Sequence, residues 1–331
     1  MATSSLARAS DAEPTSSASG RNASGTTADD RPQATRLAVE AKALAVHVPW
    51  RIWLDLARPW AIIGAAIAAC ALAPTVTVVA ICFVVIATQQ YALLILMHDG
   101  QHSLLHPRRA VNNAIAKWAI GAPCGTPFSR SQAQHLAHHQ TVGSDRDPAF
   151  QFYCRDEPSP KHGFTSLVVH FVRVLVLGRL GYSLVGEGPS RSSKKVDGTL
   201  ASYGPILLAQ AILFAIFALA GIWWAYFVLW ALPLATLVSF FDAFRQFAEH
   251  AEPVPDRDAG SRLISTQSNV IERIFLAPYG MNYHAEHHMF PFVPYYRLPR
   301  LSALIRGSAA ADTISWRRSY LSSLAIYLRG L

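Results

Sequence analysis

Two long stretches without a charged residue constrain this chain more than any other feature. Residues 59–98 are 40 consecutive positions without Asp, Glu, Lys or Arg, and residues 198–241 are 44 more. At about 1.5 Å per helical residue, each stretch is roughly 60 Å long, enough to cross a hydrocarbon core of about 30 Å twice. Soluble helices of this length keep a polar face. Each stretch therefore predicts a pair of transmembrane helices.

Helix-breaking residues divide both stretches near their middles. Ala73-Pro74-Thr75 separates a first span, which is short unless residues 52–57 extend it, from a second span. Gly221 separates the third span from the fourth. Both turns lack Lys and Arg, so the positive-inside rule places the charged segments, including both termini, on the cytoplasmic side. We expect an all-α integral membrane fold, with four transmembrane helices in two hairpins and a cytoplasmic helical cap that holds a di-metal site.

The residues outside the two stretches divide into a tail and a cap. Residues 1–36 are rich in Ser, Ala, Thr and Gly without apolar periodicity, which predicts a disordered N-terminal tail. Residues 37–331 then form one membrane domain, with transmembrane pairs at about 59–98 and 198–241 and cap segments at 99–197 and 242–331. The net charge of +8 includes no basic tract with interleaved aromatics. It predicts attraction to anionic lipid and no nucleic-acid partner.

Two further segments combine apolar side chains with arginines. Residues 163–185 are mostly apolar with Arg173 and Arg179 interspersed, and residues 316–331 alternate aromatic and aliphatic side chains with Arg317, Arg318 and Arg329. Both compositions are typical of amphipathic helices that lie in the membrane interface.

Nine of the 13 histidines gather in four clusters at or beyond the ends of the predicted spans. One cluster is His-x-x-x-His, two are His-x-x-His-His, and the fourth is a single histidine after the fourth span. The nine are His98, His102, His135, His138, His139, His250, His284, His287 and His288. Residues spaced i, i+3 and i+4 lie on one face of a helix, so each cluster presents its imidazoles together.

Clustered imidazoles predict a metal site. Neutral imidazole is the commonest metal ligand in proteins, and one zinc ion takes three or four ligands. Nine histidines are too many for one metal and suit two, with four or five ligands each and a shared open position. His106 extends His102 by another i, i+4 step and is an alternative ligand, although Pro107 follows it directly. The remaining histidines have no partner at ligand spacing: His47, His162 and His170.

The order of the clusters resembles that of a known superfamily. Together with His250 and the stretch Asn282-Tyr283-His284-Ala285-Glu286-His287-His288-Met289-Phe290-Pro291, it looks like the integral-membrane fatty acid desaturases and hydroxylases over about residues 55–305. The resemblance implies that the nine histidines hold a non-haem di-iron centre, which uses O₂ and two electrons to break an unactivated C–H bond. Two metals follow from the spacing, whereas iron and O₂ follow only from the resemblance.

Six polar residues near the histidines are candidates for orienting the imidazole rings. A histidine bound to metal usually donates its other ring N–H to a carboxylate or a carbonyl. The candidates are Asp99, Asp145, Asp147, Gln246, Glu249 and Glu286. We expect Gln246, one helical turn before His250, to reach a metal through a water molecule.

The sequence predicts an O₂-dependent membrane desaturase that inserts a C=C bond into a fatty acyl chain. A hydroxylase or ketolase of the same superfamily, acting on an alkyl, sphingoid or carotenoid substrate, is the alternative, because both outcomes use the same ligands. A haem electron carrier needs histidines inside facing spans, and a metal transporter needs polar or ionisable groups along the spans. The two apolar stretches contain almost no histidine and no charged residue, which argues against both. A zinc hydrolase leaves most of the nine histidines unexplained. Chain length, regiochemistry and acyl carrier stay open.

Electrons must come from another protein. The chain contains no His-Pro-Gly-Gly haem motif, no cysteine set for an iron–sulfur cluster and no Gly-x-Gly-x-x-Gly. The expected partner is a ferredoxin or a cytochrome b-type protein with its reductase. Residues 99–197 carry 12 basic and 7 acidic side chains, a net charge of +5 that favours an acidic partner.

Overall fold

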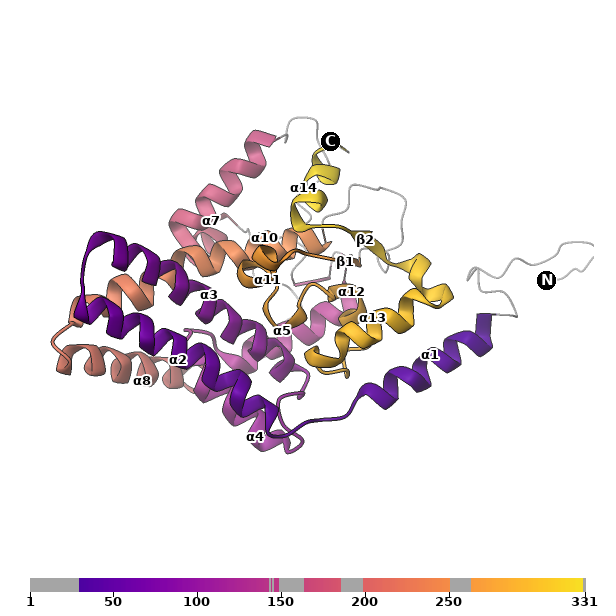
Figure 1. Ribbon diagram of the computed structural model, residues 1–331, viewed down its shortest axis with the longest axis horizontal. Helices are drawn as coiled ribbons and strands as arrows, with labels where there is room; N and C mark the ends of the chain where they lie inside the picture. The colour runs from indigo at the N-terminus through magenta and orange to yellow at the C-terminus, as the bar shows by residue number, and fades with distance from the viewer. Residues whose placement is uncertain are drawn as a thin grey trace, which may run out of the picture.

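The computed structural model describes residues 30–142, 144, 146–148, 164–185, 199–250 and 263–329, which are mostly helical (Figure 1). In chain order the α-helices are α1 (Asp30–Leu44), α2 (Arg51–Leu72), α3 (Val76–Gln101), α4 (Arg109–Ala114), α5 (Phe128–Thr141), α7 (Phe164–Val185), α8 (Thr199–Leu219), α9 (Trp223–Ala225), α10 (Ser239–His250), α11 (Val270–Phe275), α12 (His284–Met289), α13 (Leu298–Arg306) and α14 (Tyr320–Arg329). The π-helical segments are η1 (Ile115–Gly121), η3 (Tyr226–Ala231) and η4 (Leu234–Val238), and the 3₁₀-helical segments are η6 (Pro278–Gly280), η7 (Tyr295–Arg297) and η8 (Ala309–Thr313). The strands are β1 (Ile264–Thr266) and β2 (Ser315–Arg317).

Four helical stretches are long and apolar enough to cross a membrane, which fits a membrane protein. They are Arg51–Leu72, Val76–Gln101, Ala201–Leu219 and Trp223–His250. The breaks between them fall at the predicted positions, since α2 ends at Leu72, α3 begins at Val76, and Gly221 has a φ of +74° between α8 and α9. Only 6% of the apolar window of the third stretch is buried within the protein. Its side chains therefore form an apolar outer surface, as lipid contact requires.

The first apolar helix begins before the charge-free stretch that predicted it. It begins at Arg51, so that Asp55 and Arg58 lie within it. The Asp55 carboxylate accepts hydrogen bonds from Arg51 Nε (3.1 Å) and from the Tyr295 hydroxyl. The Arg58 guanidinium lies 5.0 Å from the centre of the Tyr279 ring. Arg51 offsets the charge of Asp55, and the contacts with Tyr279 and Tyr295 attach the beginning of α2 to the segments that flank α12.

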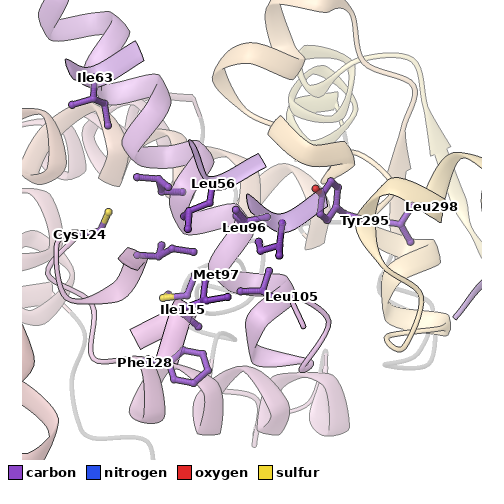
Figure 2. Close-up of a cluster of buried hydrophobic side chains, with 14 of the residues drawn as sticks. Leu56, Ile63, Leu96, Met97, Leu105, Ile115, Cys124, Phe128, Tyr295 and Leu298 are labelled. Carbon is purple, nitrogen blue, oxygen red and sulfur yellow. The ribbon is translucent and has the colours of Figure 1, made fainter. Parts of the chain in front are cut away.

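A hydrophobic core joins the apolar helices to the histidine-bearing segments. Helices α2 and α3 lie side by side (Figure 1). Their buried side chains, including Leu56, Ile63 and Leu96, pack in one cluster with Ile115 of η1 and Leu298 of α13 (Figure 2). Because these contacts link elements that are far apart in sequence, they fix α3, α5 and α13 relative to one another.

Part of the segment that was assigned to the cap lies among the apolar helices instead. The π-helix η1 packs against α3 and α8. Carbonyl oxygens of η1 and of the turn after it accept hydrogen bonds from side chains of other helical stretches. Trp60 Nε1 donates to Ala119 O (3.2 Å), and Trp230 Nε1 donates to Pro123 O (3.3 Å). Irregular backbone at membrane depth is tolerated only where protein satisfies it. These bonds satisfy carbonyl oxygens of η1 and of the turn after it with donors from the apolar helices.

A small sheet corrects the all-α prediction. Strands β1 and β2 are parallel and pair Ile264 with Ser315 and Thr266 with Arg317. The strands have three residues each and are far apart in sequence. Segments this short show no alternating apolar and polar pattern from which a strand could be predicted. Their pairing anchors the chain before α14 beside the chain before α11.

Two predictions, on the N-terminal tail and on the interfacial segment, agree with the structure only in part. Helix α1 begins at Asp30, inside the segment 1–36 that was predicted to be a disordered tail, and residues 1–29 lie outside the described part of the chain. Helix α7 covers the segment predicted to lie on the membrane, with Val172 and Val176 exposed while Phe171 and Val174 pack against α10 and η4. The interfacial position of α7 stays a prediction.

Candidate metal centre

Four segments bring the nine histidines to one place. His98 lies in the last turn of α3, and His102 directly follows that helix. Helix α5 carries three histidines, α10 ends at His250, and α12 begins at His284. The ring nitrogens form two groups, and within each group the candidate ligand atoms lie within 4.8 Å of one another. The five-histidine group is His98, His102, His135, His139 and His287, and the four-histidine group is His138, His250, His284 and His288.

The two His-x-x-His-His clusters each serve both groups. Successive helical residues are rotated by about 100°, so residue i+4 lies about 40° to one side of residue i and residue i+3 about 60° to the other side. In α5 the i and i+4 histidines join the five-histidine group, and the i+3 residue His138 joins the other. In α12 the assignment is reversed, because His287 at i+3 joins the five-histidine group. The spacing thus holds the two groups next to each other.

The nitrogen–nitrogen distances fit metal coordination. Two nitrogens bound to one metal at about 2.1 Å and at a right angle lie about 3.0 Å apart. His102 Nε2 is 2.7 Å from His135 Nε2, His287 Nε2 is 3.2 Å from His139 Nε2, and both pairs belong to the five-histidine group. His284 Nε2 is 2.8 Å from His250 Nε2 in the four-histidine group. Within the described residues the buried Nε2 of His288 makes no hydrogen bond. Both groups can therefore hold a metal ion.

The surroundings keep six of the nine imidazoles neutral. Burial lowers the pKa of His102 to about 4, and burial together with the neighbouring His102 and His138 lowers the pKa of His139 to about 3. Burial and the other imidazoles also hold the pKa values of His135, His284, His287 and His288 well below the usual value. A neutral imidazole keeps a lone pair on one ring nitrogen, which is the form that binds metal.

Two carboxylates face the second nitrogens of histidines in the four-histidine group. Asp147 lies with Oδ1 and Oδ2 at 2.8 and 2.9 Å from His138 Nδ1. Glu249 lies with Oε2 at 3.4 Å from His284 Nδ1. In both histidines a proton on Nδ1 leaves Nε2 to point into the group. These contacts are the arrangement that was predicted for Asp147 and Glu249, and their effect on a bound metal stays a prediction.

The other candidate orienting residues have different partners. Asp99 Oδ2 accepts a hydrogen bond from the backbone N–H of Tyr295 (3.0 Å), and Glu286 Oε1 accepts one from Ser265 Oγ (2.9 Å). Both attach α12 or its following loop to neighbouring elements. Gln246 Nε2 donates to Asp242 Oδ2 (2.8 Å), and its predicted role beside a metal stays a prediction. Asp145 lies outside the described residues.

Polar contacts that spacing does not reveal align the first two clusters. Gln101 Nε2 donates to Ser131 Oγ (2.7 Å), and Gln132 Nε2 donates to Gln101 O (2.8 Å). These bonds fasten the end of α3 to α5. Asn112, which is fully buried, accepts from the backbone N–H of Leu105 (3.0 Å) and so holds the loop after His102. A polar residue beside a predicted cluster is the only sequence signal for them.

Comparisons with known proteins agree with this centre. A family model described as fatty acid desaturase matches residues 72–320. The beta-carotene ketolase of Paracoccus sp. (strain N81106 / MBIC 01143) is 27% identical over 212 residues, which cover 62% of this chain and 72% of the ketolase. The dihydrorhizobitoxine desaturase of Bradyrhizobium elkanii is 25% identical over 256 residues, covering 71% and 70%. The zeaxanthin 4-ketolase of Chlamydomonas reinhardtii is 24% identical over 221 residues, covering 66% of this chain and 43% of the ketolase.

The family model covers most of the chain and spans all nine histidines. The relatives named as desaturase and ketolases imply an oxidoreductase. The chain therefore belongs to the fatty acid desaturase family.

Proposed function

We propose that the two histidine groups hold two irons and that the chain uses them, with O₂, to oxidise C–H bonds of an apolar substrate dissolved in the membrane. The observation that carries the proposal is the division of nine histidines into two adjacent groups with ligand-like nitrogen distances. Two such irons, once reduced, supply the power to activate O₂ and to remove hydrogen from an unactivated C–H bond. Asp147 and Glu249 would orient the imidazoles of His138 and His284 that hold one of the irons.

The substrate is a long apolar molecule, and desaturation of a fatty acyl chain is the reaction that we favour. Helices α3 and α10, which carry His98 and His250, continue directly from apolar stretches. A chain dissolved in the bilayer therefore needs to move only a short way along these helices to reach the histidine groups. Holding its target carbons close to the groups supplies much of the rate by proximity and orientation.

Ketone or alcohol formation is the second candidate, because two of the relatives described above are ketolases. Their names state carotene and zeaxanthin as substrates, which are long apolar molecules that a membrane also dissolves. The same histidines serve both reactions. The difference lies in whether a second hydrogen leaves the substrate or oxygen is added to it.

The test is to express the full chain together with a ferredoxin or cytochrome b-type donor and its reductase, in one host that makes only its own lipids and another that also makes carotenoids. We expect new acyl products that have lost two hydrogens, formed only when the donor is present. Products that have gained oxygen would assign the ketolase or hydroxylase reaction instead. The control is His138→Ala, which removes a member of the four-histidine group. If no product depends on the donor in either host, the function is wrong.

We further propose that the histidine groups and both termini lie on the cytoplasmic side. The turns at residues 73–75 and at Gly221 lack Lys and Arg, whereas the other segments carry all the basic residues, as the positive-inside rule requires. A fluorescent protein fused to the C-terminus is expected to fluoresce, and alkaline phosphatase fused there to stay inactive. The opposite pair of results would reverse the topology and place the electron donor on the other side.

A further inference from the structure

A buried polar network lies behind the four-histidine group, outside both sets of candidate ligands. It consists of Tyr91, Arg245, Glu249 and Tyr320, which we call the Glu249 network. Their side chains come from α3, α10 and α14, and Glu249 and Tyr320 are both 0% exposed. Burying a polar group costs free energy unless the group is hydrogen-bonded. The hydrogen bonds within the network therefore indicate what holds these side chains in place.

Each oxygen of the Glu249 carboxylate has a donor. The Tyr320 hydroxyl donates to Oε1 (2.8 Å), and Arg245 Nη1 donates to Oε2. Oε2 also faces His284 Nδ1 at 3.4 Å. Among the described residues that Nδ1 makes no hydrogen bond, although it is buried. Glu249 is thus held from two sides while its oxygen faces a ring nitrogen that needs an acceptor.

The two donors are themselves fixed by other elements. Arg245 Nε donates to the Tyr91 hydroxyl (2.7 Å), and Arg245 Nη2 donates to Asp242 Oδ1 (3.2 Å). The backbone N–H of Tyr320 donates to Glu272 Oε1 (2.8 Å), which ties the beginning of α14 to α11. The Arg245 side chain therefore cannot swing away without breaking further bonds, and the backbone that carries Tyr320 is held in place.

We propose that Arg245 and Tyr320 are positioning residues for His284. They fix the Glu249 carboxylate opposite Nδ1, so that the ring carries its proton there and turns Nε2 into the four-histidine group, 2.8 Å from His250 Nε2. The inference rests on the proposed function insofar as His284 binds a metal. It assigns a role to α14, which was predicted only as an interfacial helix. Helix α14, the last helix of the described chain, thus contributes a positioning residue to the metal centre.

The alternative is that the network only packs the core. Phe247 and Tyr327 show such packing between α10 and α14, with ring centres 4.8 Å apart. A packing role requires the ring of Tyr320 but not its hydroxyl, whereas the positioning role requires the hydroxyl. Replacing Tyr320 by phenylalanine separates the two roles, because it removes one oxygen and leaves the ring in place.

The experiment uses the full chain with Tyr320→Phe in lipid nanodiscs, loaded with ⁵⁷Fe(II), and measures iron release to ferrozine together with the Mössbauer spectrum. Loss of an outer-shell partner typically weakens metal binding by about 10- to 100-fold. We expect one iron to leave about tenfold faster and one of two spectral components to shift. The other iron should keep its release rate and its spectrum. Equal acceleration for both irons, or no change for either, would overturn the proposal.

Two controls make the result specific. Tyr296→Phe removes a hydroxyl that accepts from Val48 N–H (2.9 Å) and donates to Val46 O (3.1 Å), and we expect it to change neither iron. In a Glu249→Ala background, adding Tyr320→Phe should have no further effect on iron release, because the carboxylate that Tyr320 fixes is gone. An effect that persists there would overturn the proposal. Wild-type protein that binds two irons but forms no product would contradict the proposed function alone.

Discussion

Alanine in place of His250 is expected to remove the metal ion of the four-histidine group and all measurable turnover. Nε2 of His250 is 2.8 Å from that of His284, so the two nitrogens are adjacent ligand candidates. The substitution removes one of four candidate ligands from a metal that needs three or four. Loss of a residue that only orients a ligand weakens metal binding by about 10- to 100-fold, and loss of a ligand itself should weaken it more. Metal analysis of the purified chain should fall from about two ions to about one.

The matching substitution in the other group is His135→Ala. It leaves four of five histidines in place, so we expect a smaller loss of metal than in His250→Ala and an equally complete loss of product. In the double variant the two losses should add, because the two changes affect different groups. His47→Ala is the control, since His47 belongs to neither group. Two bound ions and normal turnover in either single variant would show that the group has been misassigned.

Substituting Gly178 by alanine is expected to cause the largest loss of stability. Gly178 has φ of 55° and ψ of −141° inside α7, a conformation that side chains with a Cβ atom avoid. A Cβ atom there would lie 1.9 Å from Ala235 O, which is backbone and cannot rotate away. Backbone strain and overpacking each cost about 1–3 kcal/mol. We expect a loss of at least about 3 kcal/mol in the free energy of unfolding.

The measurement is thermal unfolding in detergent, where this loss lowers the midpoint by about 4 °C for a chain of this size. Gly64→Ala in α2 is the matched control, because a Cβ atom there would meet nothing within 4 Å. In a helix interior alanine is favoured over glycine by about 1 kcal/mol, so the control should be neutral or slightly stabilising. Similar midpoints for the two variants would mean that α7 does not pack against η4 as described.

Local signals located the apolar helices well. The Ala73-Pro74-Thr75 break and Gly221 were identified correctly because proline and glycine act on their own backbone. The beginning of α2 was left open, because the charge-free stretch starts at residue 59 and residues 52–57, which include Asp55, were only the alternative extension; α2 begins at Arg51. Only the folded chain supplies Arg51 and Tyr295 to Asp55, and the Tyr279 ring to Arg58.

Non-local contacts were not predictable. The position of η1 among the apolar helices depends on donors from Trp60, Gln210 and Trp230, which lie in three different helical stretches. Strands β1 and β2 satisfy each other's backbone across a long separation in sequence. The cross-links of Gln101 with Ser131 and of Gln132 with the Gln101 carbonyl arise only when α3 and α5 meet.

The sequence by itself determined which nine histidines belong together, because helical spacing is a local property that residue order shows directly. Only the tertiary structure decided how the nine divide into groups of five and four, since that division depends on how α5 and α12 face each other. The tertiary structure also decided which acidic side chains face histidine ring nitrogens. Asp147 and Glu249 face imidazole nitrogens, whereas Asp99 and Glu286 bond elsewhere, although all lie near a cluster in sequence. Hydrogen bonds act over about 3 Å in space, and distance along the chain does not measure that.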